Sequence, residues 1–168
     1  MNSDALLSLA VLVGGRLKAA RELLVTAESC TGGWVAQSVT AVGGSSEWFE
    51  RGFVTYSNAS KEELLGVRRE TLEHHGAVSE ETAREMALGA LAASRGTLAL
   101  AITGVAGPTG GTPAKPVGMV CFAWASKDGS VRSETLRFTG DREKVRRQSV
   151  MRALQGVLEW LDGHGRRA

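Results

Sequence analysis

The sequence predicts an α/β protein, a three-layer α/β/α sandwich with a mixed, mostly parallel sheet of about five strands. Short apolar runs typical of β-strands alternate along the chain with segments whose apolar residues recur at helical spacing. A nearly all-apolar run at 97–103 is typical of a central strand covered on both faces, and an Asp-Gly pair at 128–129 predicts one hairpin. Because 168 residues is close to the length of one ordinary domain, we expect residues 1–168 to form a single domain.

The N-terminal part of the chain predicts a helix, a strand, a tight turn and a second helix. Apolar residues at every third or fourth position predict an amphipathic helix over residues 3–20. The apolar, β-branched run 23–27 predicts a strand, and helical spacing resumes at Trp34, directly after two glycines. Residues 28–33 should therefore lie at the carboxyl end of a strand.

The middle of the chain predicts one further strand and two helices. Alternating side chains over 51–57 predict the strand, and Asn58 is expected to cap a helix that runs through Leu65. Ser79 is expected to cap the next helix, because acidic residues follow it in the first turn, and Gly96 is expected to end that helix.

The C-terminal part predicts a long loop, a hairpin and a last helix. Residues 104–118 are rich in Gly, Pro and Thr and form a loop longer than a simple connection requires. Runs 117–126 and 131–139 predict two antiparallel strands joined through the Asp-Gly pair. Asp141 is expected to cap the last helix, and residues 162–168 are expected to form a frayed tail.

Composition excludes several classes of protein. Hydrophobic residues make up 43% of the chain and charged residues 23%, which is typical of a globular protein and not of a disordered one. No apolar run is long enough to span a membrane and no export signal is present, so we expect no membrane association and a cytoplasmic location. Cys30 and Cys121 lack the spacing of a zinc site, and we expect no metal and no cofactor. A net charge of +2 with mixed signs argues against nucleic acid as a partner.

Two loops are candidate functional sites, because ligands of open α/β sheets bind beyond the carboxyl ends of the strands. In the first, TAESCTGG (26–33), Ser29 is expected to be exposed at the turn, as a nucleophile must be. Gly32 and Gly33 would let a ligand approach the backbone closely. The alternative is that Ser29 or Thr31 only caps the helix and that the glycines only allow close packing.

The glycine-rich loop after Thr103 is the second candidate, with Gly104 and Gly107 among its residues. It matches neither the P-loop nor the dinucleotide-binding motif, so ATP hydrolysis and dinucleotide binding lack their motifs. The alternative is a mobile surface loop.

A serine needs a base before it can attack a carbonyl carbon or an amide. Lys61 is the best candidate, because it follows the second predicted strand on the same edge as Ser29 and a lysine becomes a base when burial lowers its pKa. The alternative is an ordinary exposed helix lysine. His74 and His75 precede Gly76, where imidazoles usually interact with the last carbonyls of a helix, so they are weaker candidates.

Other polar side chains lie near the same edge. Cys30 could replace Ser29 as nucleophile, although a buried structural thiol is commoner. Glu28 could orient a base or bind ribose hydroxyls, and it could equally be a capping acid. Tyr56 and Ser46 could serve the site or only their turns.

Arg142 stands in the first turn of the last helix, where a cation opposes the helix dipole. Asp141 and Glu143 could compensate for it. Alternatively, Arg142 and Arg146, four residues apart on one helix face, could clamp a phosphate or a carboxylate.

Six segments resemble, in order and at compatible spacing, the CinA C-terminal domain family in its stand-alone amidohydrolase form: TAESCTGG, GSSEWFERGFVTYSNASK, HGAVSEETAREMA, ITGVAGPTGG, KPVG and GDREKVRRQ. The resemblance extends from the first helix to about Leu161. It implies hydrolysis of the carboxamide of nicotinamide mononucleotide to nicotinate mononucleotide and ammonia, a step of pyridine-nucleotide (NAD) salvage, without metal or cofactor. Longer members of this family carry a further N-terminal domain, which this chain is too short to include.

The resemblance places catalysis on Ser29 and Lys61, supported by Ser46 and Tyr56, and it leaves either Ser29 or Ser46 as the nucleophile. The residues expected to bind substrate are Glu28, Thr31, Gly32, Gly33, Thr103, Gly104, Gly107 and Arg142. In the resulting hypothesis Ser29 attacks the amide, Lys61 moves the proton, and backbone amides near 31–33 stabilise the oxyanion.

The main alternative is a non-catalytic nucleotide-binding or regulatory module linked to competence. Lys61 separates the two, because a binding module needs no desolvated lysine beside Ser29. A metal-dependent hydrolase is disfavoured, because no cluster of His, Asp and Glu has ligand spacing. Trp48 and Phe49 favour a homodimer if they are exposed, and otherwise they belong to the core.

Overall fold

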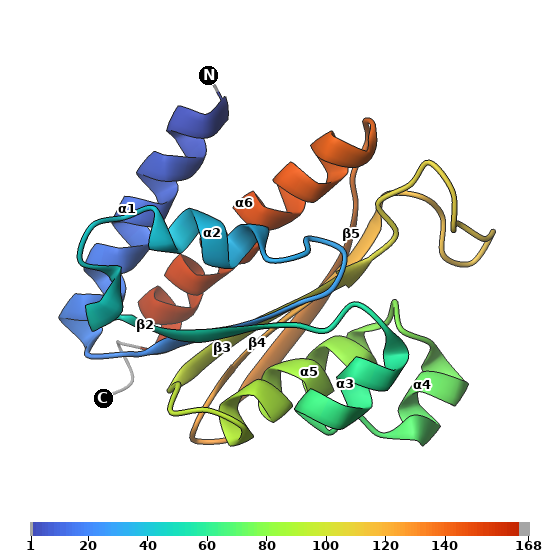
Figure 1. The fold of residues 1–168 in the computed structure, drawn as a ribbon, viewed down its shortest axis with the longest axis horizontal. Coiled ribbons are helices and arrows are strands. Elements are labelled where there is room, and N and C mark those ends of the chain that lie inside the picture. Colours follow the sequence, from blue (N-terminus) through green and yellow to red (C-terminus); the bar gives the residue numbers. More distant parts are fainter. Residues whose placement is uncertain (1, 165–168) are drawn as a thin grey trace.

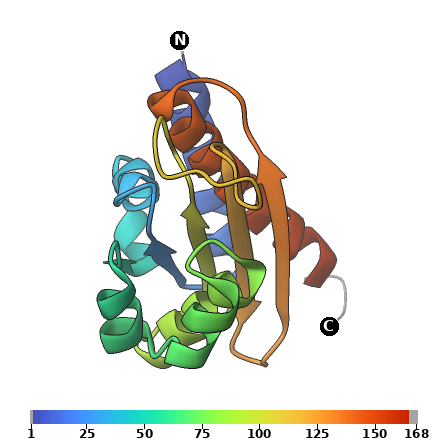
Figure 2. The same ribbon diagram turned by 90° about the vertical axis from the view of Figure 1, so that its right-hand side faces the viewer.

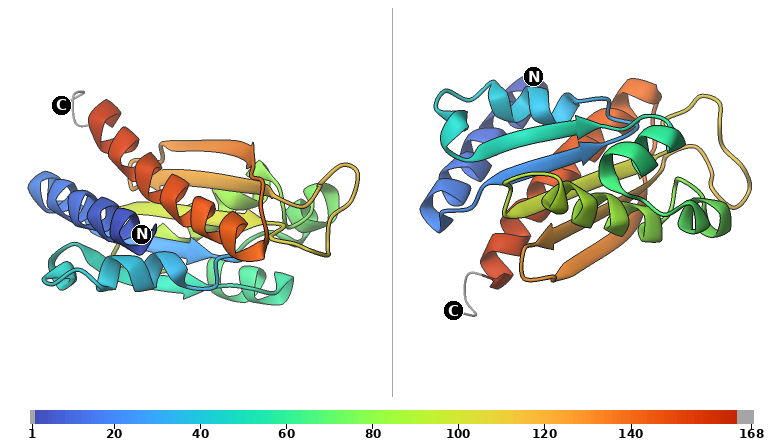
Figure 3. Two further views of the ribbon diagram at one scale, coloured as in Figure 1. Left: turned by 90° about the horizontal axis from the view of Figure 1, so that it is seen from above. Right: turned by 60° about the horizontal axis from the view of Figure 1, so that its bottom comes forward.

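A computed structural model describes residues 2–164, which form three layers with a sheet between two sets of helices (Figure 1). One face of the sheet is covered by three helices: α1 (Asn2–Ala20), α2 (Trp34–Thr40) and α6 (Arg142–His164). The other face is covered by α3 (Asn58–Leu65), α4 (Arg69–His75) and α5 (Glu80–Ala92). Figure 2 shows the sheet between the two sets, and Figure 3 shows α1 and α6 lying over it. The predicted α/β/α sandwich is confirmed.

The sheet has five strands in the order β2-β1-β3-β4-β5. Their bounds are β1 (Leu24–Glu28), β2 (Phe49–Val54), β3 (Leu98–Gly104), β4 (Met119–Ser126) and β5 (Val131–Arg137). β1 pairs in parallel with both β2 and β3, whereas β4 is antiparallel to both of its neighbours. The sheet is therefore mixed, and every strand except β4 points the same way, so β1, β2 and β3 end at one edge.

The second strand differs from its predicted position. It was expected at 51–57, but β2 begins at Phe49 and ends at Val54. Ser57 leaves the strand because its hydroxyl accepts a hydrogen bond from the amide of Ser60 at 3.1 Å and so caps α3. Asn58, expected to be that cap, is instead the first residue of the helix.

The other predicted caps are confirmed, and one helix was missed. Ser79 caps α5, since its hydroxyl accepts from the amide of Thr82 at 3.1 Å, but α5 ends at Ala92, before the predicted stop. Asp141 accepts from the amide of Lys144 at 2.9 Å at the start of α6. α4 has no capping side chain at its N-terminus, which leaves little local signal for it in the sequence.

The hairpin and the C-terminal helix follow from local chemistry. The Asp128 carboxylate accepts from the Ser126 hydroxyl and from the Ser130 amide, so it closes the turn between β4 and β5 as the Asp-Gly pair predicts. The frayed tail was predicted too early, because α6 continues through residues 162–164. The rest of that predicted tail, 165–168, lies outside the described residues.

Separate apolar clusters lie on the two faces of the sheet. Trp48 is 3% exposed and Phe49 packs against the same cluster, so the core alternative holds for both and neither supports a dimer surface. On the opposite face α3 and α5 approach closely at Gly89, where an added Cβ would lie 1.8 Å from the carbonyl oxygen of Leu65. Among the described residues, no helix is both long enough and apolar enough to span a membrane.

The Gly89 contact predicts that alanine at this position destabilises the protein, whereas a helix propensity scale predicts that it stabilises the protein. Alanine is normally a better helix residue than glycine by about 1 kcal/mol. Gly89→Ala should instead lower the free energy of unfolding by about 1–3 kcal/mol, because its methyl group collides with the end of α3. Urea denaturation gives the measurement.

Gly15→Ala in α1 is the matched control for that substitution. A Cβ at Gly15 would meet no atom within 4 Å, so this variant should be as stable as the parent or slightly more stable. Equal effects of the two substitutions would contradict the close packing of α3 on α5.

Candidate active site

The candidate site lies at the edge where the parallel strands β1, β2 and β3 end. Residues 29–33 follow β1, residues 55–57 follow β2, and the glycine-rich loop 105–118 follows β3. This edge lies toward α3 and the long loop in Figure 1, and parallel strand order alone brings the three segments together. The two loops that the sequence predicts as candidate sites therefore lie at the same edge.

The turn after β1 needs both of its glycines. The amide of Ser29 donates to the carbonyl of Ile102 in β3 at 3.0 Å, and the amide of Gly32 then donates back to the Ser29 carbonyl at 3.0 Å. Gly32 has a φ of 60° and Gly33 has a φ of 101°, and both values lie in the left-handed region that glycine adopts at least cost. Ser29 was expected to be exposed, but it is only 7% exposed because this turn folds back onto the sheet.

Glu28 is a capping acid in this structure. It is 1% exposed, and its Oε1 accepts from the Thr31 hydroxyl at 2.6 Å and from the amide of Val35 at 2.9 Å. Its Oε2 accepts from the amide of Ala36 at 3.0 Å, so a negative charge satisfies the first turn of α2. The predicted contact of Glu28 and Thr31 side chains with substrate is therefore disfavoured, because both are buried and engaged with each other.

Lys61 is buried beside Ser29. It is 1% exposed, and its Nζ lies 3.1 Å from Ser29 Oγ, 3.0 Å from the carbonyl oxygen of Thr55 and 3.3 Å from that of Tyr56. Burial lowers the pKa of the Lys61 amine, because the charged form loses its hydration. In the neutral amine the nitrogen lone pair can accept the Ser29 hydroxyl proton, which is what a general base requires.

The competing nucleophile and bases are less well placed. Burial raises the pKa of the Cys30 thiol to about 12, so this group stays protonated near neutral pH. His74 and His75 end α4, and His75 Nδ1 lies 3.7 Å from the carboxylate of Glu81. Among the described residues, Lys61 is the titratable side chain hydrogen-bonded to Ser29.

Ser46 lies at the other edge of the sheet. It belongs to a 3-10 helix, η1 (Ser45–Glu47), which precedes β2 and so lies where the parallel strands begin. Its neighbour Glu47 pairs with Lys18 near the end of α1 at 3.2 Å. Because Lys61 lies where these strands end, one chain cannot use Ser46 and Lys61 together, and the predicted role of Ser46 is not supported.

Arg142 links three segments above the site. Its Nη1 donates to the Gly107 carbonyl at 2.8 Å, and its Nη2 donates to the Tyr56 hydroxyl at 3.3 Å. Both Arg142 and Tyr56 are exposed, whereas Thr103 is buried and donates its hydroxyl to the carbonyl of Ala77. The glycine-rich loop is anchored at its base, since Gly104 pairs with Val120 in the sheet.

The sequence predicts Arg146 as the second arm of an anion clamp with Arg142, but in the structure its guanidinium binds backbone oxygens. Its Nε donates to the Cys30 carbonyl at 3.0 Å and its Nη2 donates to the Thr31 carbonyl at 3.1 Å. Its guanidinium also lies over the Trp34 ring, 5.3 Å from the centroid. The only signal for this residue in the sequence is its place one helical turn after Arg142.

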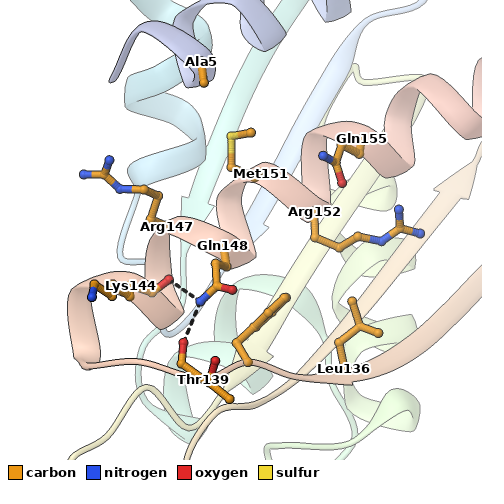
Figure 4. Close-up of a pocket in the computed structure, with 10 residues that line it drawn as sticks. Ala5, Leu136, Thr139, Lys144, Arg147, Gln148, Met151, Arg152 and Gln155 are labelled. Carbon is orange, nitrogen blue, oxygen red and sulfur yellow. Dashed lines mark hydrogen bonds between the residues drawn. The ribbon is translucent and has the colours of Figure 1, made fainter. Parts of the chain in front are cut away.

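A separate cavity of about 620 Å³ lies between α1, α6 and β5 (Figure 4). Its lining includes Phe138, Lys144, Arg147 and Met151, and it includes none of the residues around Ser29. Among residues 2–164, no group of three or more His, Cys, Asp or Glu side chains is arranged to hold a metal ion.

Comparison with known proteins gives consistent matches over nearly the whole chain. The CinA C-terminal domain family model matches residues 6–161. The nicotinamide-nucleotide amidohydrolase PncC of Escherichia coli K12 is 54% identical over 159 residues, which cover 95% of this chain and 96% of that protein. A CinA-like protein of Chlorobium phaeobacteroides is 56% identical over 92% of this chain but only 38% of its own length.

Solved structures agree with these sequence matches. A crystal structure of a CinA superfamily protein from Klebsiella pneumoniae has a TM-score of 0.91 at 40% identity, covering 94% of this chain and 98% of that one. The competence/damage inducible protein of Agrobacterium tumefaciens has a TM-score of 0.89 at 42% identity, covering 92% of this chain and 94% of that one.

The buried amine predicts a dependence of stability on pH. Between its lowered folded pKa and the ordinary value of 10.5, the unfolded chain binds a proton at Lys61 that the folded chain does not bind. The free energy of unfolding should therefore rise with pH across this window, by about 1.4 kcal/mol for each unit by which the pKa is lowered.

Lys61→Met isolates this contribution, because methionine keeps most of the side-chain volume without the titrating group. The unfolding free energy of the parent minus that of the variant should be constant below the folded pKa of Lys61. Between that pKa and pH 10.5 this difference should increase, because the parent gains stability and the variant has no group that titrates there. Parallel urea denaturation curves at a series of pH values measure it. A constant difference throughout would mean that the Lys61 pKa is unchanged by folding.

Proposed function

The chain belongs to the CinA C-terminal domain family, and we propose that it hydrolyses the carboxamide of nicotinamide mononucleotide to nicotinate mononucleotide and ammonia. The observation that carries this proposal is the buried Lys61 amine at hydrogen-bond distance from the Ser29 hydroxyl. The identity of 54% with an amidohydrolase that is matched over 96% of its length supports the substrate class. The reaction belongs to pyridine-nucleotide salvage.

The reaction follows a serine and lysine mechanism in two halves. Ser29 Oγ attacks the carboxamide carbon while Lys61 Nζ takes the hydroxyl proton. The tetrahedral intermediate collapses as Lys61 returns that proton to the departing nitrogen, which leaves as ammonia and leaves a nicotinyl ester on Ser29. Water then attacks the ester carbonyl, with Lys61 again accepting a proton and returning it to the Ser29 oxygen. Nicotinate mononucleotide is released and both side chains regain their starting forms.

Backbone amides in the turn are the candidate donors to the oxyanion. The amide of Gly32 is engaged with the Ser29 carbonyl, but no hydrogen bond within the described part of the chain uses the amides of Thr31 or Gly33. Both groups lie a few residues after the nucleophile in the glycine turn, and Gly33 is the better candidate because it is half-buried, whereas Thr31 is 0% exposed. Donors fixed in advance stabilise developing charge without reorganisation, and removing one such donor typically costs about 100–1,000-fold in rate.

Arg142 is the candidate partner of the substrate phosphate. It is exposed, and its two hydrogen bonds go to neutral oxygens, which leaves other N–H groups of the guanidinium available for an anion. Tyr56 and Gly107 would then shape the entrance that leads from the phosphate to Ser29. A cation in the first turn of α6 opposes the helix dipole, and an anionic ligand bound to Arg142 would offset this cost.

A non-catalytic nucleotide-binding module is the second candidate, and the same glycine-rich edge would serve it. Burial of Lys61 weighs against this candidate, because a desolvated lysine is costly and groups with a perturbed pKa cluster at catalytic sites. A homodimer, a cytoplasmic location and the absence of a nucleic-acid partner remain predictions.

The direct test of the proposed function is turnover of nicotinamide mononucleotide by the purified chain, with and without a chelator. Ammonia release and chromatography of the product measure it. Ser29→Ala and Lys61→Met should each lower kcat by about 1,000-fold or more while both stay folded, because each removes a group that makes or breaks bonds.

Ser46→Ala decides between the two serines, and it should retain the parental kcat. Full activity in Ser29→Ala together with loss in Ser46→Ala would reverse the assignment of the nucleophile. If the parent itself releases no ammonia, the enzyme proposal fails and the binding module takes its place.

A separate prediction concerns the phosphate. Arg142→Gln should raise KM for nicotinamide mononucleotide by about 10–100-fold, the usual value of a charge-assisted hydrogen bond, with a small change in kcat. The same substitution should hardly change KM for nicotinamide riboside, which lacks the phosphate. Steady-state kinetics with both substrates give the comparison, and equal effects on the two would place the phosphate elsewhere.

A further inference from the structure

Tyr56 is an aromatic side chain that the fold leaves largely in water. It is 64% exposed, whereas every Trp and Phe side chain of the described chain is buried or half-buried. Its hydroxyl accepts from Arg142 Nη2 at 3.3 Å. Among residues 2–164 no cation lies over its ring and no second aromatic ring packs against it. The ring is therefore open to a ligand.

Tyr56 connects the two ends of the proposed site. Its backbone carbonyl accepts from Lys61 Nζ at 3.3 Å, and that nitrogen lies 3.1 Å from Ser29 Oγ. The tip of its side chain meets Arg142, the candidate partner of the phosphate. In nicotinamide mononucleotide the pyridine ring is bonded to the carboxamide carbon and, through ribose, to the phosphate. A substrate that reaches from Ser29 to Arg142 must therefore place its ring along the Tyr56 side chain.

The ring of this substrate is a cation, because its nitrogen is bonded to ribose as a pyridinium. Glu28, the acidic residue next to Ser29 in the chain, does not serve this charge, since it is 1% exposed and binds the amides that begin α2. Lys61 does not oppose the cation, because burial lowers its pKa and favours the neutral amine. The face of a phenol ring attracts a cation without carrying a charge itself.

We propose that Tyr56 is a specificity-determining residue, whose ring binds the cationic pyridinium of the substrate by a cation–π contact. The inference rests on the proposed function and goes beyond it: the site selects oxidised pyridine nucleotides over the reduced dihydropyridine forms, whose ring is uncharged. The ring charge is the same in the substrate and in the transition state for attack on the carboxamide. Loss of the contact should therefore raise KM and leave kcat unchanged.

The test compares two ligands that differ in ring charge, nicotinamide mononucleotide and its reduced dihydro form. Both ligands carry the carboxamide and the phosphate. Ser29→Ala is the background, because it should bind the nucleotide without hydrolysing it, and isothermal titration calorimetry gives the two dissociation constants. The oxidised ligand should bind about 3–30-fold more tightly than the reduced one, the usual range of a cation–π contact.

Tyr56→Leu and Tyr56→Phe, each added to Ser29→Ala, separate the ring face from the hydroxyl. Tyr56→Phe keeps the aromatic face and loses the hydrogen bond to Arg142, so it should keep the preference for the oxidised ligand. Tyr56→Leu should bring the two dissociation constants to within about twofold of each other. In the active protein, Tyr56→Leu should raise KM for nicotinamide mononucleotide by about 3–30-fold with kcat unchanged.

The other outcomes overturn the inference. No preference in Ser29→Ala, or an unchanged preference after Tyr56→Leu, removes the cation–π contact. An equal loss in Tyr56→Phe assigns the effect to the hydroxyl, and a lowered kcat with normal KM in Tyr56→Leu makes Tyr56 part of the chemical step. Circular dichroism checks folding, and Tyr56→Gln gives the same comparison if Tyr56→Leu does not fold. A parent that releases no ammonia would reject the proposed function itself, whereas an active parent with any of these results would reject only this inference.

Discussion

Lys61 loses nearly all of its contact with water on folding, and three oxygen atoms take its place, from the Ser29 hydroxyl and the carbonyls of Thr55 and Tyr56. Such burial is costly for a charged amine, so the surrounding structure must hold these partners at the correct distance. The Thr55 and Tyr56 carbonyls are available because β2 ends at Val54 and the chain turns into α3. The packing of α3 against α5 at Gly89 then keeps the helix that carries Lys61 close to the sheet.

The other half of the site depends on a turn that opposite charges hold from two sides. Glu28 binds the amides that begin α2, and Arg146 binds the carbonyls that precede them. Both charged groups bind atoms of this turn and of the first turn of α2, and among the described residues no carboxylate pairs with Lys61. The two glycines permit the left-handed backbone that this arrangement needs. Together these features keep the backbone around Ser29 ordered.

One helix serves two parts of the site. α6 places Arg142 at the glycine-rich loop and Arg146, one turn later, at the turn after β1. The first guanidinium is exposed and suited to an anionic ligand, whereas the second is partly buried and engaged with carbonyls. A match to this domain covers 96% of the amidohydrolase of Escherichia coli but only 38% of the longer protein of Chlorobium phaeobacteroides.

The sequence alone determined most of the fold and predicted that two candidate loops share one edge of the sheet. The correct predictions rest on local conformational preferences, each of which depends on a few neighbouring residues. They are the strand and helix periodicity, the caps at Ser79 and Asp141 and the Asp-Gly hairpin. Ordered motifs also identified the family. The boundary of β2 was placed too late and α4 was missed, because their ends depend on contacts that periodicity does not record.

Tertiary structure alone decided how the polar residues divide their tasks. Ser29 and Lys61 are 32 positions apart and meet because β1 and β2 are parallel neighbours, and the same topology sends Ser46 to the opposite edge. Glu28 became a cap and Arg146 a support for the turn through contacts with distant backbone groups. A residue type shows what a side chain can do, but strand order and helix packing decide what lies within its reach.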